Sequence, residues 1–244
     1  MGPTPPGLRL SPAAGTAGWC GGQLLHPGLL ACDRCPRLAS FRAQADAVRA
    51  PGRLRGADYW ARPVPLFGDP QARLLLVGMA PGFHGANRTG IPFCGDVSGR
   101  LIYGALHRLG AASHPDPELA GADLELRGVA ISNAVKCVPP GNAPLPGERH
   151  TCRDWLAADL THLASLRAIV ALGHVAHDAL LDLAGQHTAI RRADHRFAHG
   201  TVHRLDGLGV PVLDSFHPSP LNSNRGIISA DLLAELLRPL LDPP

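Results

Sequence analysis

Short apolar runs, each ending in a loop rich in glycine, proline or polar residues, constrain the fold of this chain more than any other feature. Four such runs have the composition of buried β-strands: Arg73–Met79, Arg127–Val135, Arg167–Leu172 and Val210–Phe216. Helix-like segments alternate with them, over residues 29–50, 98–109, 148–163, 173–184 and 229–240. This alternation predicts a three-layer α/β/α sandwich around a central, mostly parallel, four-stranded sheet.

The domain organisation follows from length and local composition. Residues 1–27 are rich in proline, glycine and alanine, and we interpret them as a flexible N-terminal arm. Residues 28–244 are long enough for a single domain with its own core. The formal net charge of +3 permits nucleic-acid binding without requiring it, because an ordinary enzyme can carry the same charge.

The sequence shows neither an apolar run of about 20 residues nor a basic segment followed by an apolar stretch at its start. We therefore expect no membrane partner and a cytoplasmic location. Reducing conditions there make metal ligation or free thiols better interpretations of the six cysteines than disulfides.

Four of the cysteines form two groups. Cys32 and Cys35 make a C-x-x-C motif, and Cys137 and Cys152 form a second, more widely spaced pair. Two such pairs can provide a four-thiolate site for a structural Zn²⁺ or for a [4Fe–4S] cluster. A metal-free C-x-x-C is the alternative. A redox motif of the thioredoxin kind fits less well, because Cys32 and Cys35 do not directly follow a predicted strand.

Three unusual segments follow the first, second and fourth predicted strands. They begin after Met79, Ser132 and Phe216. Ligands bind at the carboxyl ends of the strands in parallel sheets, so we expect these segments to form one site.

These segments resemble the uracil-DNA glycosylase superfamily, and within it the iron–sulfur family 5 (type B) enzymes. Residues 78–96 read G-x-A-P-G-x-H-G-x-N-R-T-G-x-P-F-x-G-D, and residues 217–222 read H-P-S-P-L-N. C-x-x-C-P-R-L at residues 32–38 and V-K-C-x-P-P-G-N at residues 135–142 match as well. The resemblance extends from about residue 30 to the C-terminus.

The resemblance implies hydrolysis of the N-glycosidic bond of uracil in DNA, by base flipping, with hypoxanthine and other deaminated bases as further substrates. It also implies a structural [4Fe–4S] cluster bound by Cys32, Cys35, Cys137 and Cys152. We expect DNA as the partner and a monomeric protein. A damaged-DNA-binding protein without catalytic activity is the alternative, and a zinc protein that binds nucleotides is a third hypothesis.

Asp96 is the first catalytic candidate. A carboxylate can orient the attacking water, remove a proton and offset positive charge on the sugar. In other glycosylases of the superfamily, a polar residue precedes the proline of the first motif, which is Pro81 in this chain. Family 5 enzymes lack that polar residue, and the position is Ala80 here. The alternative for Asp96 is a side chain that caps the following helix.

Two more catalytic candidates come from other strand ends. The amide of Asn133 offers a donor and an acceptor to a pyrimidine edge, although asparagine commonly stabilises turns. His217 can donate to the leaving base or to a phosphate. Phe93 can stack on the base, or can be an ordinary core aromatic.

Further contacts are predicted around the catalytic candidates Asp96, Asn133 and His217. For the base pocket we expect Gly82, Phe83, His84 and Gly85, with Phe83 a candidate wall against the thymine methyl group. For DNA contacts we expect Arg88, Lys136, Ser219, Leu221, Asn222 and Arg225, with Leu221 a wedge in the gap left by the flipped base. Solvated surface charges are the alternative for the basic residues.

Overall fold

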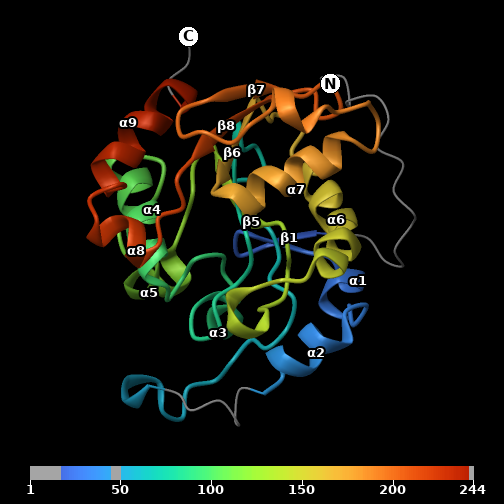
Figure 1. Ribbon diagram of the computed structural model, residues 1–244. Coiled ribbons are helices and arrows are strands. Elements are labelled where there is room, and N and C mark those ends of the chain that lie inside the picture. Colours follow the sequence, from blue (N-terminus) through green and yellow to red (C-terminus); the bar gives the residue numbers. More distant parts are fainter. Residues whose placement is uncertain (1–17, 45–50, 242–244) are drawn as a thin grey trace.

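A twisted sheet forms the centre of the protein, and helices cover both of its faces (Figure 1). The computed structural model describes residues 18–44 and 51–241. The described residues form an eight-stranded sheet with the order β1-β2-β3-β5-β4-β6-β8-β7. The strands are β1 (Gly18–Cys20), β2 (Gln23–Leu25), β3 (Phe67–Gly68), β4 (Leu74–Gly78), β5 (Val129–Asn133), β6 (Ala168–Leu172), β7 (Val202–Arg204) and β8 (Pro211–Ser215).

The helices lie before, between and after these strands. They are α1 (Pro27–Leu30), α2 (Pro36–Arg42), α3 (Ala86–Thr89), α4 (Val97–Arg108), α5 (Pro117–Ala120), α6 (Pro146–Thr161), α7 (His174–Ala184), α8 (Pro220–Asn224) and α9 (Ala230–Leu241). Short 3₁₀ turns are η1 (Gly52–Leu54), η2 (Gly121–Asp123), η3 (Pro140–Asn142) and η4 (Arg192–Asp194).

The predicted parallel centre is confirmed. Strands β5, β4, β6 and β8 pair in parallel, with Leu76 opposite both Ile131 and Val170. Their side chains alternate between two cores, since successive residues of a strand point to opposite faces. Leu74 and Leu76 pack with residues of α4 and α9, whereas Leu75 and Val77 pack with residues of α6 and α7. This arrangement is the predicted three-layer sandwich.

The sheet is wider than the predicted four strands. Antiparallel β3 extends it beyond β5, and antiparallel β7 extends it beyond β8. Residues 18–25, which we predicted as part of the flexible arm, instead form the β1–β2 hairpin and pair through β2 with β3. That part of the arm prediction is wrong. Backbone hydrogen bonds attach the hairpin to the edge of the sheet, and Leu24 and Trp19 also pack on the core beneath α6 and α7. Residues 1–17 lie outside the described residues.

The predicted helix over residues 29–50 is two short helices, α1 and α2, with Cys32 and Cys35 between them. Pro36 explains the interruption. It occupies the first turn of α2, and Cys35 before it is extended, with φ −115° and ψ 90°. The C-cap of α2 is Ala43, and residues 45–50 of the predicted helix lie outside the described residues.

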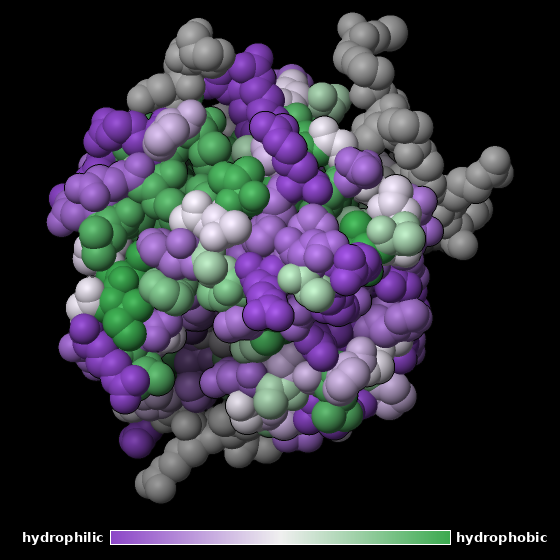
Figure 2. Space-filling model, turned by 45° about the horizontal axis from the view of Figure 1, so that its top comes forward, coloured by the Kyte–Doolittle hydropathy of each residue, from purple (hydrophilic) through white to green (hydrophobic). Residues whose placement is uncertain are grey.

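The surface is mixed in character. Figure 2 shows hydrophilic residues over much of one face, with hydrophobic residues gathered on the left, the side on which α9 lies in Figure 1. Among the described helices, none combines the length and the apolar composition that crossing a membrane requires.

Candidate active site

A pocket of about 530 Å³ opens at the carboxyl ends of the parallel strands. It brings together the three segments predicted to meet there, and it adds residues that follow β6. Its lining residues are Met79, Ala80, Gly82, Phe93, Asp96, Val97, Ser98, Asn142, Leu172, Gly173, His174, Val175, His217, Ser219 and Pro220.

The carboxylate of Asp96 packs directly against glycine backbone. A Cβ atom on Gly82 would lie 2.5 Å from Asp96 Oδ1, and one on Gly85 would lie 2.0 Å from it. Both positions therefore need glycine, which lets the backbone approach closely. Asp96 occupies the N-cap position of α4, but its side chain makes no capping hydrogen bond. The alternative interpretation of Asp96 as a helix cap is therefore wrong.

Burial raises the pKa of Asp96 to about 6, against the opposing effects of backbone hydrogen bonds from Ala86 and Gly82 and of the nearby Arg88. Desolvation disfavours the charged form of a carboxyl group. A carboxyl group with this pKa is mainly ionised at pH 7 but is a much better proton acceptor than an exposed aspartate.

Phe93 is held in a strained conformation. Its φ is +60°, which is rare for an aromatic residue. Its ring lies against Gly78, where a Cβ atom would come within 2.4 Å of the ring, and its centroid is 6.3 Å from that of His217. Strain of this kind persists only where the surrounding structure enforces it, and it is concentrated at functional sites.

Asn133 ends β5 and pairs in register with Gly78 of β4. The side chain is buried, and its Oδ1 has no hydrogen-bond partner. Asn133 does not itself line the pocket, but its Oδ1 would be 2.5 Å from a Cβ on Gly78, the glycine that also contacts Phe93. Burial without a partner costs free energy, so this amide is available to a ligand.

His217 follows β8 and presents its ring to the pocket. Burial lowers its pKa, so the imidazole is neutral at pH 7. The backbone holds the residue in place, since Asn222 Nδ2 and the Ser219 amide both donate to the His217 carbonyl at 2.8 Å. Gly173, with φ +95°, makes room for it, because a Cβ there would lie 3.0 Å from His217 Cβ.

The four cysteines predicted as ligands line one small cavity of about 20 Å³ between α2, α6 and the segment after β5. Arg42 Nη1 donates to Cys137 Sγ at 3.0 Å, and the Lys136 amide donates to Cys152 Sγ at 3.2 Å. Burial raises the pKa of Cys137 to about 11 and of Cys152 to about 12, so neither is a thiolate at pH 7 unless a cation is bound. The donor atoms and the hydrogen bonds to sulfur suit a metal group.

Comparison with known proteins agrees with this geometry. The model of the "Uracil DNA glycosylase superfamily" matches residues 65–241. A "Type-5 uracil-DNA glycosylase" from Thermus thermophilus is 45% identical over 209 residues, which are 86% of this chain and 92% of that protein. Another of the same name, from Pyrobaculum aerophilum, is 43% identical over 86% of this chain and 88% of its own length. A "Type-4 uracil-DNA glycosylase" of that organism is 31% identical over 81% of this chain and 82% of its own.

The chain belongs to the uracil-DNA glycosylase superfamily. Its similarity to the type-5 proteins exceeds its similarity to the type-4 protein, so the predicted family is confirmed.

Not every predicted pocket residue of this glycosylase-family chain lies at the pocket. Phe83 does not line it, and its ring instead packs against Phe41 and Tyr59, with centroids 5.1 and 5.9 Å away. His84 Nδ1 is 2.7 Å from the Tyr59 hydroxyl, and its carbonyl accepts from Arg88 Nε at 2.9 Å. These contacts hold the loop in shape, and base contacts by Phe83 and His84 stay predictions.

Lys136 is the clearest correction among the predicted DNA contacts. Its side chain is 1% exposed, and its Nζ pairs with the Asp159 carboxylate and with the Ser132 hydroxyl. A buried, paired ammonium cannot reach a phosphate, so the prediction is wrong. The prediction rested on the position of Lys136 after a strand end. That position does not reveal its partner Asp159, which lies on α6.

The other residues predicted to contact DNA differ in how exposed their side chains are. Leu221 is 59% exposed on α8, and Arg225 just after that helix is also exposed. Ser219 caps α8 and lines the pocket. Arg88, by contrast, is already paired with Glu118 and is mostly buried.

The structure adds three polar residues that sequence reasoning missed: Ser98, Asn142 and His174. Asn142 closes the V-K-C-x-P-P-G-N segment and has φ +54°. His174 begins α7 just after β6, which corresponds to the third predicted strand. Its position at the carboxyl end of a parallel strand is the sequence signal for this residue.

Proposed function

We propose that the protein is a monofunctional DNA glycosylase that hydrolyses the N-glycosidic bond of uracil, releasing the free base and leaving an abasic site. One observation carries the proposal: a largely desolvated carboxyl group with pKa about 6, Asp96, lines the same pocket as the neutral imidazole of His217. The names of the similar proteins support uracil as the base.

The base must leave the DNA stack to reach these groups. The pocket of about 530 Å³ has room for a flipped pyrimidine nucleotide. Phe93 supplies an aromatic surface at the pocket, and base–aromatic stacking contributes about 1–3 kcal/mol. The exposed Leu221 is placed to fill the gap in the duplex.

Asn133 is the group that reads the base. Uracil offers a carbonyl beside an N–H, and an amide side chain matches both. The buried Oδ1 without a partner would accept the uracil N–H, which removes an existing desolvation cost. Discrimination of this type rests on a polar group that a wrong base leaves unsatisfied.

Bond cleavage places positive charge on the sugar and negative charge on the departing base. The neutral His217 can donate its ring N–H to the base oxygen on which negative charge develops. The ionised Asp96 offsets the sugar's positive charge, orients a water toward C1′ and accepts its proton.

We further propose a [4Fe–4S] cluster held by Cys32, Cys35, Cys137 and Cys152, with a structural role. A tetrahedral Zn²⁺ with bonds of about 2.3 Å would bring the sulfurs to about 3.8 Å from one another. Within the described residues, no three of these sulfur atoms lie within 4.8 Å of one another, which favours a larger group. A brown protein with about four irons per chain would support the cluster, and a colourless zinc protein would contradict it.

The direct test is release of free uracil from a synthetic duplex by the purified holoprotein, with thymine- and cytosine-containing duplexes as controls. Duplexes with hypoxanthine, xanthine and mismatched thymine define the range of bases. Uracil-DNA that remains alkali-stable after incubation would contradict the proposal, and tight binding without release would favour a damaged-DNA-binding protein instead.

A further inference from the structure

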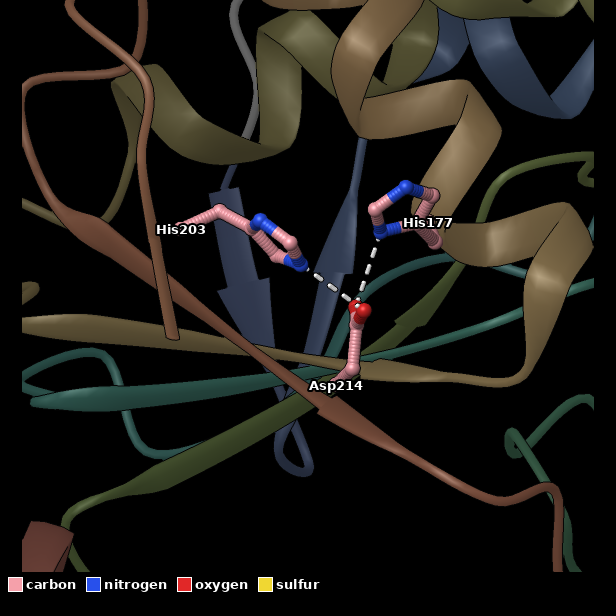
Figure 3. A group of neighbouring side chains, drawn as sticks. All are labelled: His177, His203 and Asp214. Atoms are coloured by element: carbon pink, nitrogen blue, oxygen red, sulfur yellow. Dashed lines mark hydrogen bonds and ion pairs between the residues drawn. The ribbon is translucent and has the colours of Figure 1, made fainter. Parts of the chain in front are cut away.

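A second group of titratable side chains lies inside the molecule, apart from the pocket and from the cysteines. His177 on α7, His203 on β7 and Asp214 on β8 converge there, with side chains 4%, 5% and 0% exposed (Figure 3). None of the three lines the pocket, and the proposed hydrolysis uses none of them.

Both histidines point at the same carboxylate. His177 Nδ1 is 2.8 Å from Asp214 Oδ1, and His203 Nε2 is 2.9 Å from Asp214 Oδ2. The two ring centroids are 5.0 Å apart. Within the described residues, this is the one group of three metal-ligating side chains whose donor atoms all lie within 4.8 Å of one another.

The other ring nitrogen of His177 fixes its tautomer. Nε2 is 2.9 Å from the carbonyl oxygen of His195, which can only accept, so Nε2 carries the hydrogen. In the neutral ring, Nδ1 then has a lone pair directed at Asp214 Oδ1. Two acceptors this close repel one another unless a cation offsets the repulsion, either a proton shared between them or a metal ion bound to both from one side.

The buried carboxylate also needs a positive charge. Among the ion pairs of the described residues, Asp214 pairs with the two histidines and with no lysine or arginine. In the part of the chain that the structure describes, the carboxylate accepts one further hydrogen bond, from the Ala198 amide to Oδ2 at 3.1 Å. An ionised carboxylate without a compensating charge is costly in the protein interior.

We propose that His177, His203 and Asp214 form a binding site for a divalent transition-metal ion of the Zn²⁺ class. Imidazole nitrogens with one carboxylate suit such ions, whereas Ca²⁺ and Mg²⁺ prefer oxygen ligands. The His177–His195 hydrogen bond is the outer contact that metal-bound histidines commonly make through their second nitrogen. Both carboxylate oxygens face a histidine, so Asp214 can bind through two oxygens.

The ion would have a structural role beside the active site. It would tie α7 and the edge strand β7 to β8, and β8 ends two residues before His217. The site is independent of the proposed uracil chemistry and of the iron–sulfur group.

The test uses the full-length holoprotein without a histidine tag, given one equivalent of ZnCl₂ and desalted at pH 7.5. Elemental analysis should find about one zinc per chain in addition to the iron. Zinc K-edge X-ray absorption should show only nitrogen and oxygen ligands at about 2.0–2.2 Å. Zinc bound by sulfur at about 2.3 Å would mean occupation of the cysteine site, and it would overturn the proposal, as would wild-type protein that retains no zinc.

Two variants sharpen the result. His203→Gln should lose the nitrogen- and oxygen-bound zinc while keeping its iron, whereas His187→Gln, a change at an exposed position just after α7, should keep both. Zinc should raise the wild-type melting temperature by roughly 5 °C and leave that of His203→Gln unchanged. Equal zinc contents in the two variants would overturn the proposal. If His203→Gln fails to fold, the zinc X-ray absorption spectrum of the wild-type protein decides between nitrogen and oxygen ligands, which support the site, and sulfur ligands, which overturn it.

Discussion

Two clusters of polar residues lie near the carboxyl ends of β4 and β5, and they differ in how far their members are paired. In the first, Lys136, Asp159 and Ser132 satisfy one another through an ion pair and hydrogen bonds. In the second, Asn133 Oδ1 has no partner and the carboxyl group of Asp96 keeps a raised pKa. Adjacent residues of the chain, Ser132 and Asn133, belong to different clusters.

The difference separates groups that maintain the fold from groups available to a substrate. Paired buried groups stabilise one structure, because removing a partner leaves an uncompensated charge. Desolvated groups that lack a hydrogen-bond partner or a direct ion-pair partner cost stability, and they persist where a ligand or a reaction uses them. Changes in the second cluster should therefore lower activity and spare the fold, and changes in the first should do the reverse.

Asp96→Asn should have the largest effect on activity. We expect uracil release to fall about 10³-fold, since the variant can neither take a proton nor offset charge on the sugar. Stability should rise, because burial raises the folded pKa from 3.8 to about 6 and so makes the ionised group unfavourable above pH 4. At pH 7 the gain should reach up to about 3 kcal/mol by urea unfolding. A variant that is both inactive and less stable would contradict this interpretation.

Lys136→Met should destabilise the fold by about 3–4 kcal/mol, since it leaves the buried Asp159 carboxylate without its cation. Urea unfolding measures the loss, and activity per folded molecule should stay within about threefold of wild type. The matched control is Arg127→Met, which breaks the exposed pair with Glu125 and should cost less than about 0.5 kcal/mol. A comparable loss in the two variants would remove the distinction between the clusters.

Asn133→Ala should lower kcat/KM for uracil about 100-fold, near 2.7 kcal/mol, with much smaller effects on unfolding. The reason is that Oδ1 makes no hydrogen bond within the described protein, so the fold loses no bond at that atom. Gln71→Ala, at an exposed position just before β4 and away from the pocket, is the control for both measurements. Strong destabilisation by Asn133→Ala would place this residue in the structural cluster.

The pH dependence should give the smallest effect. Under the proposed mechanism Asp96 acts in its ionised form, and its pKa is about 6. The logarithm of kcat/KM should then be flat near pH 7.5 and fall about tenfold per unit below pH 6. Asp206→Asn, at an exposed position, should keep this profile. The residual activity of Asp96→Asn should no longer fall below pH 6. A rate that holds constant down to pH 5 would exclude the ionised Asp96 from the reaction.

The sequence by itself determined the parallel centre of the fold and the place of the site. Four apolar runs could be nothing but buried strands or buried helices, and the loops after them located Asp96, Asn133 and His217. An apolar run predicts a buried strand from the local sequence, because a strand buried on both faces requires apolar residues throughout. The motifs around Asp96 and His217 also identified the family, which the comparisons confirmed.

Tertiary structure alone decided which polar groups are paired. Lys136 and Asp159 are far apart in the sequence, as are His177 and Asp214, and no local pattern relates them. The β1–β2 hairpin joins the sheet through backbone hydrogen bonds and through Leu24 and Trp19, two apolar residues too few to form a recognisable sequence pattern. Pairing and burial depend on contacts between distant segments, so the difference between a structural lysine and a DNA-binding one appears only when the chain is folded.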